Sequence, residues 1–255
     1  MAVEMETVGH RGAMGYEDEN TLASFKKAIE MGVDMIEYDV YSLATDDSVP
    51  YEESIVVMHD DTVERTTDGT GNITDYTPET IRNLRTKNGH AIPTLKEVLE
   101  LVDKRAVDNK RTKQDIELKG RGTARKVAKV IEKYVGEKGW RYDDFVISSI
   151  DHEQLKIFHQ ALPQVPIGAL FDGPPIQDAM ERSKTLGATF VGPSLEFVTR
   201  EFITLAHQNE MKCFVYTVNE PPDIERMRKW GADAIFSNYP DRVKVPRPRN
   251  PHIAS

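Results

Sequence analysis

The stretch Met35-Ile-Glu37-Tyr-Asp39-Val40 alternates apolar and acidic side chains, which is the pattern of a β-strand with one polar face. Successive side chains of a strand point to opposite faces, so Glu37 and Asp39 are neighbours on one face. Two carboxylates this close repel unless a cation neutralises them, and an all-oxygen pair suits Mg²⁺ or Ca²⁺. The competing interpretation is an ion pair with a lysine or arginine of a neighbouring element.

Three more strand-like runs carry ionisable side chains at or near their ends. Charged and imidazole groups are depleted in strands and costly to bury unpaired, so four such runs require a common explanation. In a barrel of parallel strands the carboxyl ends meet at the catalytic face, and one shared site there explains all four runs. The three runs are Thr7-Val-Gly9 followed by His10-Arg11, Ile55-Val-Val-Met58 followed by His59-Asp60, and Asp115-Ile-Glu117-Leu-Lys119.

Strand-like and helix-like segments alternate almost to the end of the chain, which is typical of a parallel sheet wrapped by helices. The sequence therefore predicts an α/β fold, a (β/α)8 TIM barrel, with a small insertion after the third strand-like segment. The strand candidates number one more than a barrel needs, so one is an irregular segment or a hairpin arm. The weakest is 190–194, which Gly192 and Pro193 interrupt. The candidates are 7–10, 35–40, 55–59, 115–119, 145–150, 167–171, 190–194, 213–218 and 234–237.

Start and stop signals mark helices between these runs. Asn20 or Thr21 caps a helix that ends at Gly32, and Thr94-Leu-Lys-Glu97 has the spacing of a capping box. The polar interval 60–92 breaks the rhythm and is expected to be an insertion at the barrel mouth within a single domain, 1–245. A flexible tail is expected at 246–255. Further helices are expected at 78–84, 123–135, 152–162, 176–186, 199–210 and 222–230.

The composition argues against several classes of function. The chain has 255 residues, 39% of them hydrophobic, which suffices for a full core. Its net charge of −9 argues against nucleic acid and anionic membrane surfaces as partners. No run of about 18 apolar residues occurs, so no stable membrane insertion is expected. Cys213 is the only cysteine, which excludes an intrachain disulfide and is compatible with a cytoplasmic location.

The ionisable residues of the four runs match the needs of metal-assisted phosphodiester hydrolysis. One imidazole can take a proton from the attacking water and another can protonate the departing alkoxide, which are roles for His10 and His59. Arg11 and Lys119 supply positive charge for a phosphoryl oxygen that gains negative charge in the transition state. Glu117 is the natural third metal ligand beside the acidic pair.

Other polar residues are assigned structural roles. Asp60 can orient His59 or begin the following turn, and the turn is favoured. The glycine-rich stretch 69–71 does not follow a strand and precede a helix, so it is weak support for nucleotide binding. The histidines in polar or helical surroundings are expected to be structural, namely His90, His152, His159, His207 and His252.

The ordered set of motifs resembles the glycerophosphodiester phosphodiesterase family, a branch of the phospholipase-C-like barrels. Their order and spacing span nearly the whole chain, and the set is far more specific than any single motif. The motifs are Gly-His10-Arg11-Gly, Glu19-Asn20-Thr21 with Phe25 and Ala28, Gly32-Val-Asp-Met-Ile-Glu37-Tyr-Asp39-Val, Val57-Met-His59-Asp60, Arg65-Thr-Thr-Asp-Gly-Thr-Gly71, Ile92-Pro-Thr-Leu, Ile116-Glu117-Leu-Lys119, Tyr216-Thr-Val-Asn219 and Asn238-Tyr-Pro-Asp241.

The resemblance implies a barrel with an inserted segment and one divalent cation, Mg²⁺ or Ca²⁺, bound by Glu37, Asp39 and Glu117. It implies acid–base roles for the two histidines and phosphate contacts for Arg11 and Lys119. The implied reaction is hydrolysis of small-molecule glycerophosphodiesters, such as glycerophosphocholine, to an alcohol and glycerol 3-phosphate.

Several positions depart from the family pattern. Asp18 stands where proline is usual, Tyr216 where tryptophan is common, and Ser237-Asn238 where Thr-Asp is common. The segment 45–54 is longer than usual. None of these positions is among the proposed metal or proton-transfer residues, but Tyr216 and the 45–54 segment are candidates for the substrate wall.

Three other functions are compatible with parts of this pattern. A lysophospholipase D activity, with or without a cyclic phosphate product, would use the same site. A non-catalytic barrel that binds a phosphorylated ligand would not need both histidines. A metal-dependent barrel enzyme that abstracts a proton next to a carbonyl could use Lys119 as base, but it leaves the paired histidines unexplained.

Overall fold

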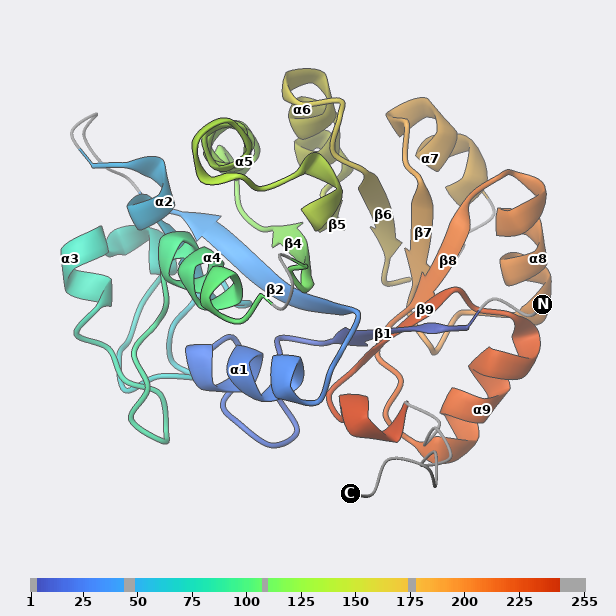
Figure 1. The fold of residues 1–255 in the computed structure, drawn as a ribbon, viewed down its shortest axis with the longest axis horizontal. Coiled ribbons are helices and arrows are strands. Elements are labelled where there is room, and N and C mark those ends of the chain that lie inside the picture. The colour runs from blue at the N-terminus through green and yellow to red at the C-terminus, as the bar shows by residue number, and fades with distance from the viewer. Residues whose placement is uncertain (1–3, 44–48, 107–109, 174–177, 244–255) are drawn as a thin grey trace, which may run out of the picture.

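The computed structural model describes residues 4–43, 49–106, 110–173 and 178–243. Its parallel strands form the predicted (β/α)8 barrel, which closes because β1 pairs with β9 on one side and with β2 on the other. Helices surround the barrel (Figure 1). The strands are β1 Glu6–Gly9, β2 Met35–Ser42, β3 Ile55–Val57, β4 Lys113–Leu118, β5 Phe145–Ser149, β6 Ile167–Phe171, β7 Phe190–Pro193, β8 Lys212–Val215 and β9 Ala234–Ser237.

The predicted capping signals start two of the helices. Thr21 accepts a hydrogen bond from the backbone N–H of Ser24 at the start of α1, and Thr94 and Glu97 form the expected capping box of α4. The helices are α1 Leu22–Glu30, α2 Tyr51–Ser54, α3 Pro78–Ile81, α4 Leu95–Lys104, α5 Thr123–Lys138, α6 His152–Ala161, α7 Ala179–Leu186, α8 Arg200–Gln208 and α9 Pro221–Trp230, with 3₁₀ turns η1 Ile73–Asp75, η2 Tyr142–Asp144 and η3 Pro240–Arg242.

The strand outside the barrel is β3, so the prediction that 190–194 is the weak candidate was wrong. β3 runs antiparallel to β2 as the arm of a hairpin, with Val57 opposite Val40. β7 pairs in parallel with both β6 and β8. Gly192 suits this strand because a Cβ there would lie 2.3 Å from Cδ2 of Leu170, so glycine leaves room for that side chain.

The barrel interior is apolar near the amino-terminal ends of several strands. Met35, Phe190 and Ala234 are the first residues of their strands, and they belong to one buried cluster with Phe214 and Phe236. A larger buried cluster fills the space between the sheet and the helices. Because the lower interior is filled with apolar side chains, polar groups that point into the barrel gather toward its carboxyl end.

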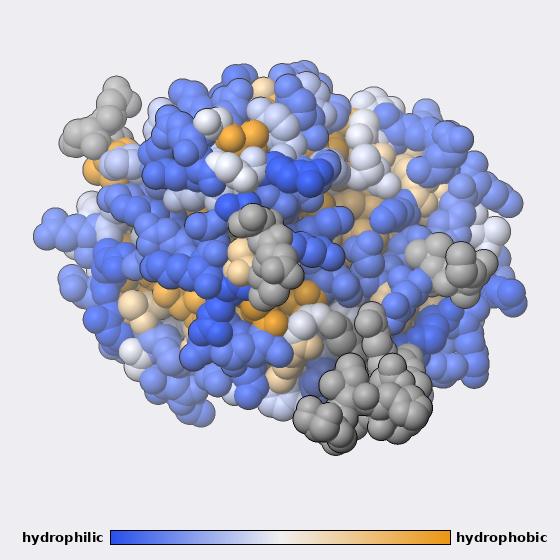
Figure 2. Space-filling model, viewed as in Figure 1, coloured by the Kyte–Doolittle hydropathy of each residue, from blue (hydrophilic) through white to orange (hydrophobic). Residues whose placement is uncertain are grey.

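The segment between β3 and α4 contains short helical elements and a small apolar cluster of its own, in which Val63, Ile73 and Ile81 pack near β2 and β3. The face of the molecule in Figure 2 is mostly hydrophilic, with small hydrophobic areas. Among the described residues, no helix is both long enough and apolar enough to cross a membrane. The expected tail 246–255 and residues 45–48 of the candidate wall lie outside the described residues.

Candidate active site

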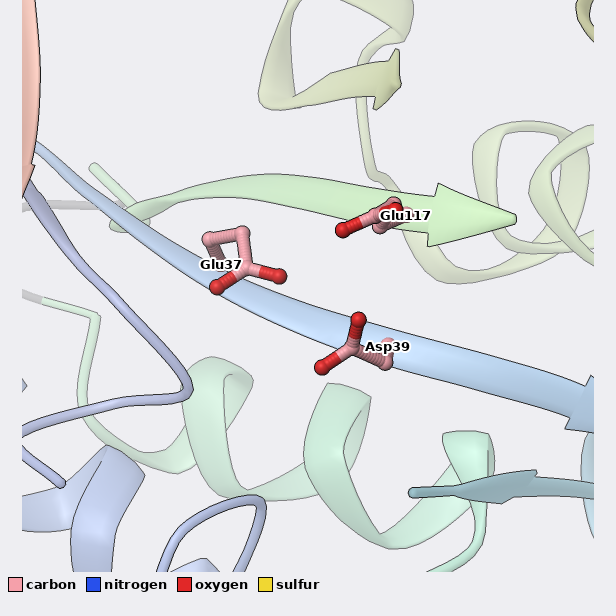
Figure 3. A group of neighbouring side chains, drawn as sticks. All are labelled: Glu37, Asp39 and Glu117. Carbon is pink, nitrogen blue, oxygen red and sulfur yellow. The ribbon is translucent and has the colours of Figure 1, made fainter. Parts of the chain in front are cut away.

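Three predicted metal ligands meet between two adjacent strands. Glu37 and Asp39 lie on β2, and Glu117 lies on β4 directly across from Asp39 in the strand register. The three carboxylates point toward one another in Figure 3. One oxygen from each lies within 4.8 Å of the others, and all three residues are buried. The alternation on β2 and the parallel pairing with β4 therefore build the cluster that the sequence predicts.

Burial and mutual repulsion make this cluster unfavourable without positive charge. Burial, with the negative charge of Asp39, raises the pKa of Glu117 to about 8 and that of Glu37 well above its ordinary value. Burial opposes ionisation of Asp39 too, but Lys119 and Arg11 hold its pKa below the ordinary value. Nζ of Lys119 and Nε of Arg11 each lie 3.4 Å from an Asp39 oxygen.

The residues present suit a divalent cation. Oε1 of Glu37 and Oδ1 of Asp39 are buried and accept no hydrogen bond from any described residue. Buried carboxylate oxygens are normally satisfied by hydrogen bonds or by a metal ion, and a set made only of oxygens is the kind that Mg²⁺ and Ca²⁺ prefer. A cation could bind both of these oxygens and Glu117.

The two predicted acid–base histidines have different surroundings. Nδ1 of His10 lies 2.7 Å from the amide oxygen of Asn238, and burial together with the charge of Arg11 lowers its pKa to about 4. His10 is therefore neutral at physiological pH. Nδ1 of His59 lies 2.6 Å from Oδ1 of Asp60, and a third of its side chain is exposed. In both rings Nδ1 is engaged, which leaves Nε2 for the substrate.

The preferred interpretation of Asp60 as a simple turn residue was wrong. Its carboxylate holds the imidazole of His59, and its pKa is lowered to about 2, chiefly by hydrogen bonding from Arg65 and also by His59. A carboxylate on Nδ1 fixes the orientation of the ring and turns Nε2 away from Asp60. The His-Asp sequence alone does not distinguish this contact from a turn.

A cavity of about 180 Å³ joins these groups. The lining combines the polar groups predicted from the sequence with several apolar side chains. Tyr216, the candidate for the substrate wall, is among the lining residues, and its hydroxyl is buried without a hydrogen-bond partner among the described residues. The lining residues are His10, Arg11, Glu37, His59, Glu117, Lys119, Ser148, Ile150, Leu170, Tyr216, Thr217 and Phe236.

Several polar neighbours were missed in the sequence. Asn20, considered as a helix cap, instead donates from Nδ2 to Asp39 at 2.9 Å. Asp115 lies opposite Glu37 in the register and accepts from the hydroxyl of Ser148 at 2.7 Å, and burial raises its pKa to about 7. Asp115 shares the inward face with Glu117 at spacing two, so the alternation on β4 could have identified it.

The remaining histidines have contacts away from the acidic cluster. His207 lies 2.8 Å from Oδ2 of Asp233, and Nε2 of His152 lies 3.0 Å from the carbonyl of Leu170. None of the described histidines other than His10 and His59 lines the cavity. His252 lies outside the described residues.

The acidic cluster should make the metal-free protein less stable as pH rises. Between 4.5, the ordinary pKa of a glutamate, and about 8, the folded chain keeps a proton on Glu117 that the unfolded chain has released. Unfolding therefore releases this proton and becomes more favourable as pH rises. His10 acts in the opposite direction, but only between its folded pKa of about 4 and its ordinary 6.5, since above 6.5 it is neutral in both states.

In chelator, we therefore expect the melting temperature to fall by several degrees between pH 6.5 and 8. One titrating group changes the free energy of unfolding by at most about 1.4 kcal/mol per pH unit, which sets the size of this fall. Saturating Mg²⁺ should abolish this fall because a bound cation replaces the retained proton. Glu117→Gln has no proton to retain and should show a smaller fall in chelator. A thermal melt series in which Glu117→Gln matches the unsubstituted protein at every pH would contradict this explanation.

The comparisons with known proteins agree on one family. Residues 10–242 match the model of the glycerophosphoryl diester phosphodiesterase family. A glycerophosphodiester phosphodiesterase of Caldanaerobacter subterraneus subsp. tengcongensis is 33% identical over 92% of this chain and 95% of its own length. One from Bacillus altitudinis is 32% identical over 92% of this chain and 96% of its own. The solved structure of an Oleispira antarctica phosphodiesterase in complex with its product sn-glycerol-3-phosphate superposes with a TM-score of 0.78, at 26% identity, over 93% of this chain and 94% of that one.

Proposed function

Because the chain belongs to the glycerophosphoryl diester phosphodiesterase family, we propose that it hydrolyses glycerophosphodiesters to an alcohol and glycerol 3-phosphate. This makes it a phosphoric diester hydrolase. The observation that carries the proposal is the single cavity lined by two imidazoles, two cationic side chains and two of the three clustered carboxylates. A product complex of a relative with the same fold supports the same substrate class.

Glu37, Asp39 and Glu117 would hold one divalent cation, Mg²⁺ or Ca²⁺. When bound, such an ion polarises a phosphoryl oxygen and offsets the charge that develops on it. Arg11 and Lys119 would add fixed positive charge at the same phosphoryl group. Both side chains line the cavity and are held near Asp39, so they need little rearrangement to meet an anionic group.

His10 suits the role of general base. The amide oxygen of Asn238 can only accept a hydrogen bond, so Nδ1 of His10 donates to it and Nε2 carries the free lone pair. That lone pair would take a proton from the attacking water. His59 suits the role of general acid because Asp60 holds its Nδ1 and leaves Nε2 toward the cavity, from which a proton on Nε2 would pass to the departing alkoxide oxygen.

Tyr216 would form part of the wall that contacts the substrate. Its hydroxyl is a buried group without a hydrogen-bond partner among the described residues, and Tyr216 lines the cavity. Tyr216→Phe should raise KM for glycerophosphocholine about fivefold, since a neutral hydrogen bond contributes about 1 kcal/mol, and change kcat little. Steady-state kinetics would test this. An unchanged KM would show that the hydroxyl does not contact the substrate.

A panel of substrates tests the proposed function. Purified protein with Mg²⁺ would be incubated with glycerophosphocholine, glycerophosphoethanolamine and lysophosphatidylcholine, and the products followed by ³¹P NMR. We expect glycerol 3-phosphate from the first two. Turnover of the lysolipid alone would indicate a lysophospholipase D, and a cyclic phosphate would indicate attack by the substrate's own hydroxyl. Binding without turnover of any member would indicate a phospho-ligand-binding barrel.

A further inference from the structure

One arginine in the segment between β3 and α4 links two parts of the site that are far apart in sequence. The guanidinium of Arg65 donates to both oxygens of Glu19, from Nη1 at 2.7 Å and from Nη2 at 2.8 Å. It also donates to Asp60, through Nε and through Nη2, the latter at 3.1 Å. Glu19 precedes α1 and Asp60 follows β3, so Arg65 holds two loops together.

Each of these carboxylates also holds a residue of the cavity. Oε1 of Glu19 accepts from Nη1 of Arg11 at 2.7 Å, and Oδ1 of Asp60 lies 2.6 Å from Nδ1 of His59. The contacts therefore form a continuous chain from Arg11 through Glu19, Arg65 and Asp60 to His59. Arg65 itself is not among the residues that line the cavity.

The charges make this chain of contacts strong. The Glu19 side chain is 10% exposed; although burial opposes its ionisation, Arg65 and Arg11 hold its pKa below the ordinary value. The planar guanidinium can bind two carboxylates at once with a fixed geometry. Lysine has a single ammonium group and no such fork, so it cannot reproduce the arrangement.

A second contact ties the same two loops together. The carboxylate of Asp18 accepts hydrogen bonds from the Thr86 hydroxyl at 2.5 Å and from the backbone and side chain of Asn88 at 3.0 and 2.7 Å. Asp18 stands where the family resemblance leads one to expect proline, which has no side-chain acceptor. Neighbouring acidic residues, Asp18 and Glu19, thus hold both Arg65 and the later part of the same segment.

We propose that Arg65 is a positioning residue of the reaction, which fixes the phosphate-facing Arg11 and the proton-transferring His59 relative to each other through Glu19 and Asp60. This proposal rests on the proposed function. Its consequence is that the segment between β3 and α4 contributes to turnover without supplying a group to the reacting atoms.

Arg65→Ala should therefore impair the positioning of His59 and of Arg11 together. We expect kcat for glycerophosphocholine to fall about tenfold or more, because small displacements of a proton donor are costly, and KM to rise about fivefold through Arg11. Asp60→Asn should lower mainly kcat, and Glu19→Gln should raise mainly KM. Arg65→Lys should recover only part of the loss, since an ammonium lacks the planar fork that pairs with both oxygens of Glu19 while it also reaches Asp60.

Double substitutions decide whether Arg65 acts through these carboxylates. In the Asp60→Asn background, Arg65→Ala should lower kcat little further, and in the Glu19→Gln background it should raise KM little further. Arg82→Ala is the matched control. Arg82 lies in the same segment, has a similarly exposed side chain and makes a bidentate ion pair with Glu97. Because neither Arg82 nor Glu97 lines the cavity, its loss should leave both kinetic constants unchanged.

Binding of inorganic phosphate, measured by calorimetry, provides a readout that does not depend on turnover. Arg65→Ala should weaken it several-fold, and Arg82→Ala should not. If the unsubstituted protein hydrolyses no glycerophosphodiester, the proposed function fails while this binding still tests the link to Arg11. Wild-type kinetic constants and phosphate affinity in Arg65→Ala, or full additivity with Asp60→Asn and Glu19→Gln, would overturn the proposal.

Discussion

Replacing His59 by alanine is expected to lower kcat for glycerophosphocholine about a hundredfold or more while the protein remains folded, because it removes the proposed general acid. The imidazole is partly exposed, and its Nδ1 contact is with the adjacent Asp60, so its loss leaves no large buried cavity. Steady-state kinetics and a thermal melt on the same preparation would separate catalysis from stability.

His207→Ala is the matched control for His59→Ala. Its imidazole is also partly exposed and also lies close to an aspartate, Asp233, but it is not among the cavity residues. Its kcat should equal that of the unsubstituted protein. If His59→Ala retained near-normal kcat, the assignment of His59 as general acid would be wrong, whatever the control did.

Replacing Glu37 by glutamine is expected to weaken Mg²⁺ binding at least about tenfold, since it removes one of the three proposed carboxylate ligands, and to abolish most turnover. The substitution preserves shape, and the amide oxygen can still accept from the backbone N–H of Arg11, which now donates to Oε2 at 2.8 Å. It also removes a carboxyl group whose ionisation is opposed by burial and by the negative charges of Asp39 and Glu117. In chelator we therefore expect a higher melting temperature than that of the unsubstituted protein.

Glu52→Gln is the control for the removal of a buried glutamate charge. Glu52 is buried on α2, pairs with Lys133 and is not among the residues that line the cavity. It should leave Mg²⁺ affinity unchanged and should not raise the melting temperature in chelator. Equal Mg²⁺ affinity in Glu37→Gln and the unsubstituted protein, measured by calorimetry, would exclude Glu37 as a ligand.

The sequence predicts those parts of the fold and the site that depend on local periodicity. Alternation places Glu37 and Asp39 on one face, and the succession of strands and helices predicts the barrel that the structure confirms. The direction of a short strand has no local signal, which explains the error over β3 and 190–194. From the sequence, Gly192 indicates an interrupted strand. In the structure it is required within the strand because the side chain of Leu170 leaves no room for a Cβ.

Side-chain contacts are the part that the sequence could not predict. The turn preference for Asp60 failed because the orientation of its carboxylate depends on Arg65 and His59 together. The pairing of Arg65 with Glu19 joins residues 46 positions apart, and no periodicity relates them. Asp115 differs, because its position on the inward face of β4 follows from the same alternation as Glu117 and was overlooked.

The most direct test of the central claim is a cation titration of metal-stripped protein, with glycerol 3-phosphate release from glycerophosphocholine as the readout. The carboxylate cluster predicts no measurable hydrolysis in chelator and a return of activity on adding Mg²⁺ or Ca²⁺ that saturates at a single site per chain. Hydrolysis that continues at the full rate after exhaustive removal of metal would contradict the claim that Glu37, Asp39 and Glu117 act through a bound cation.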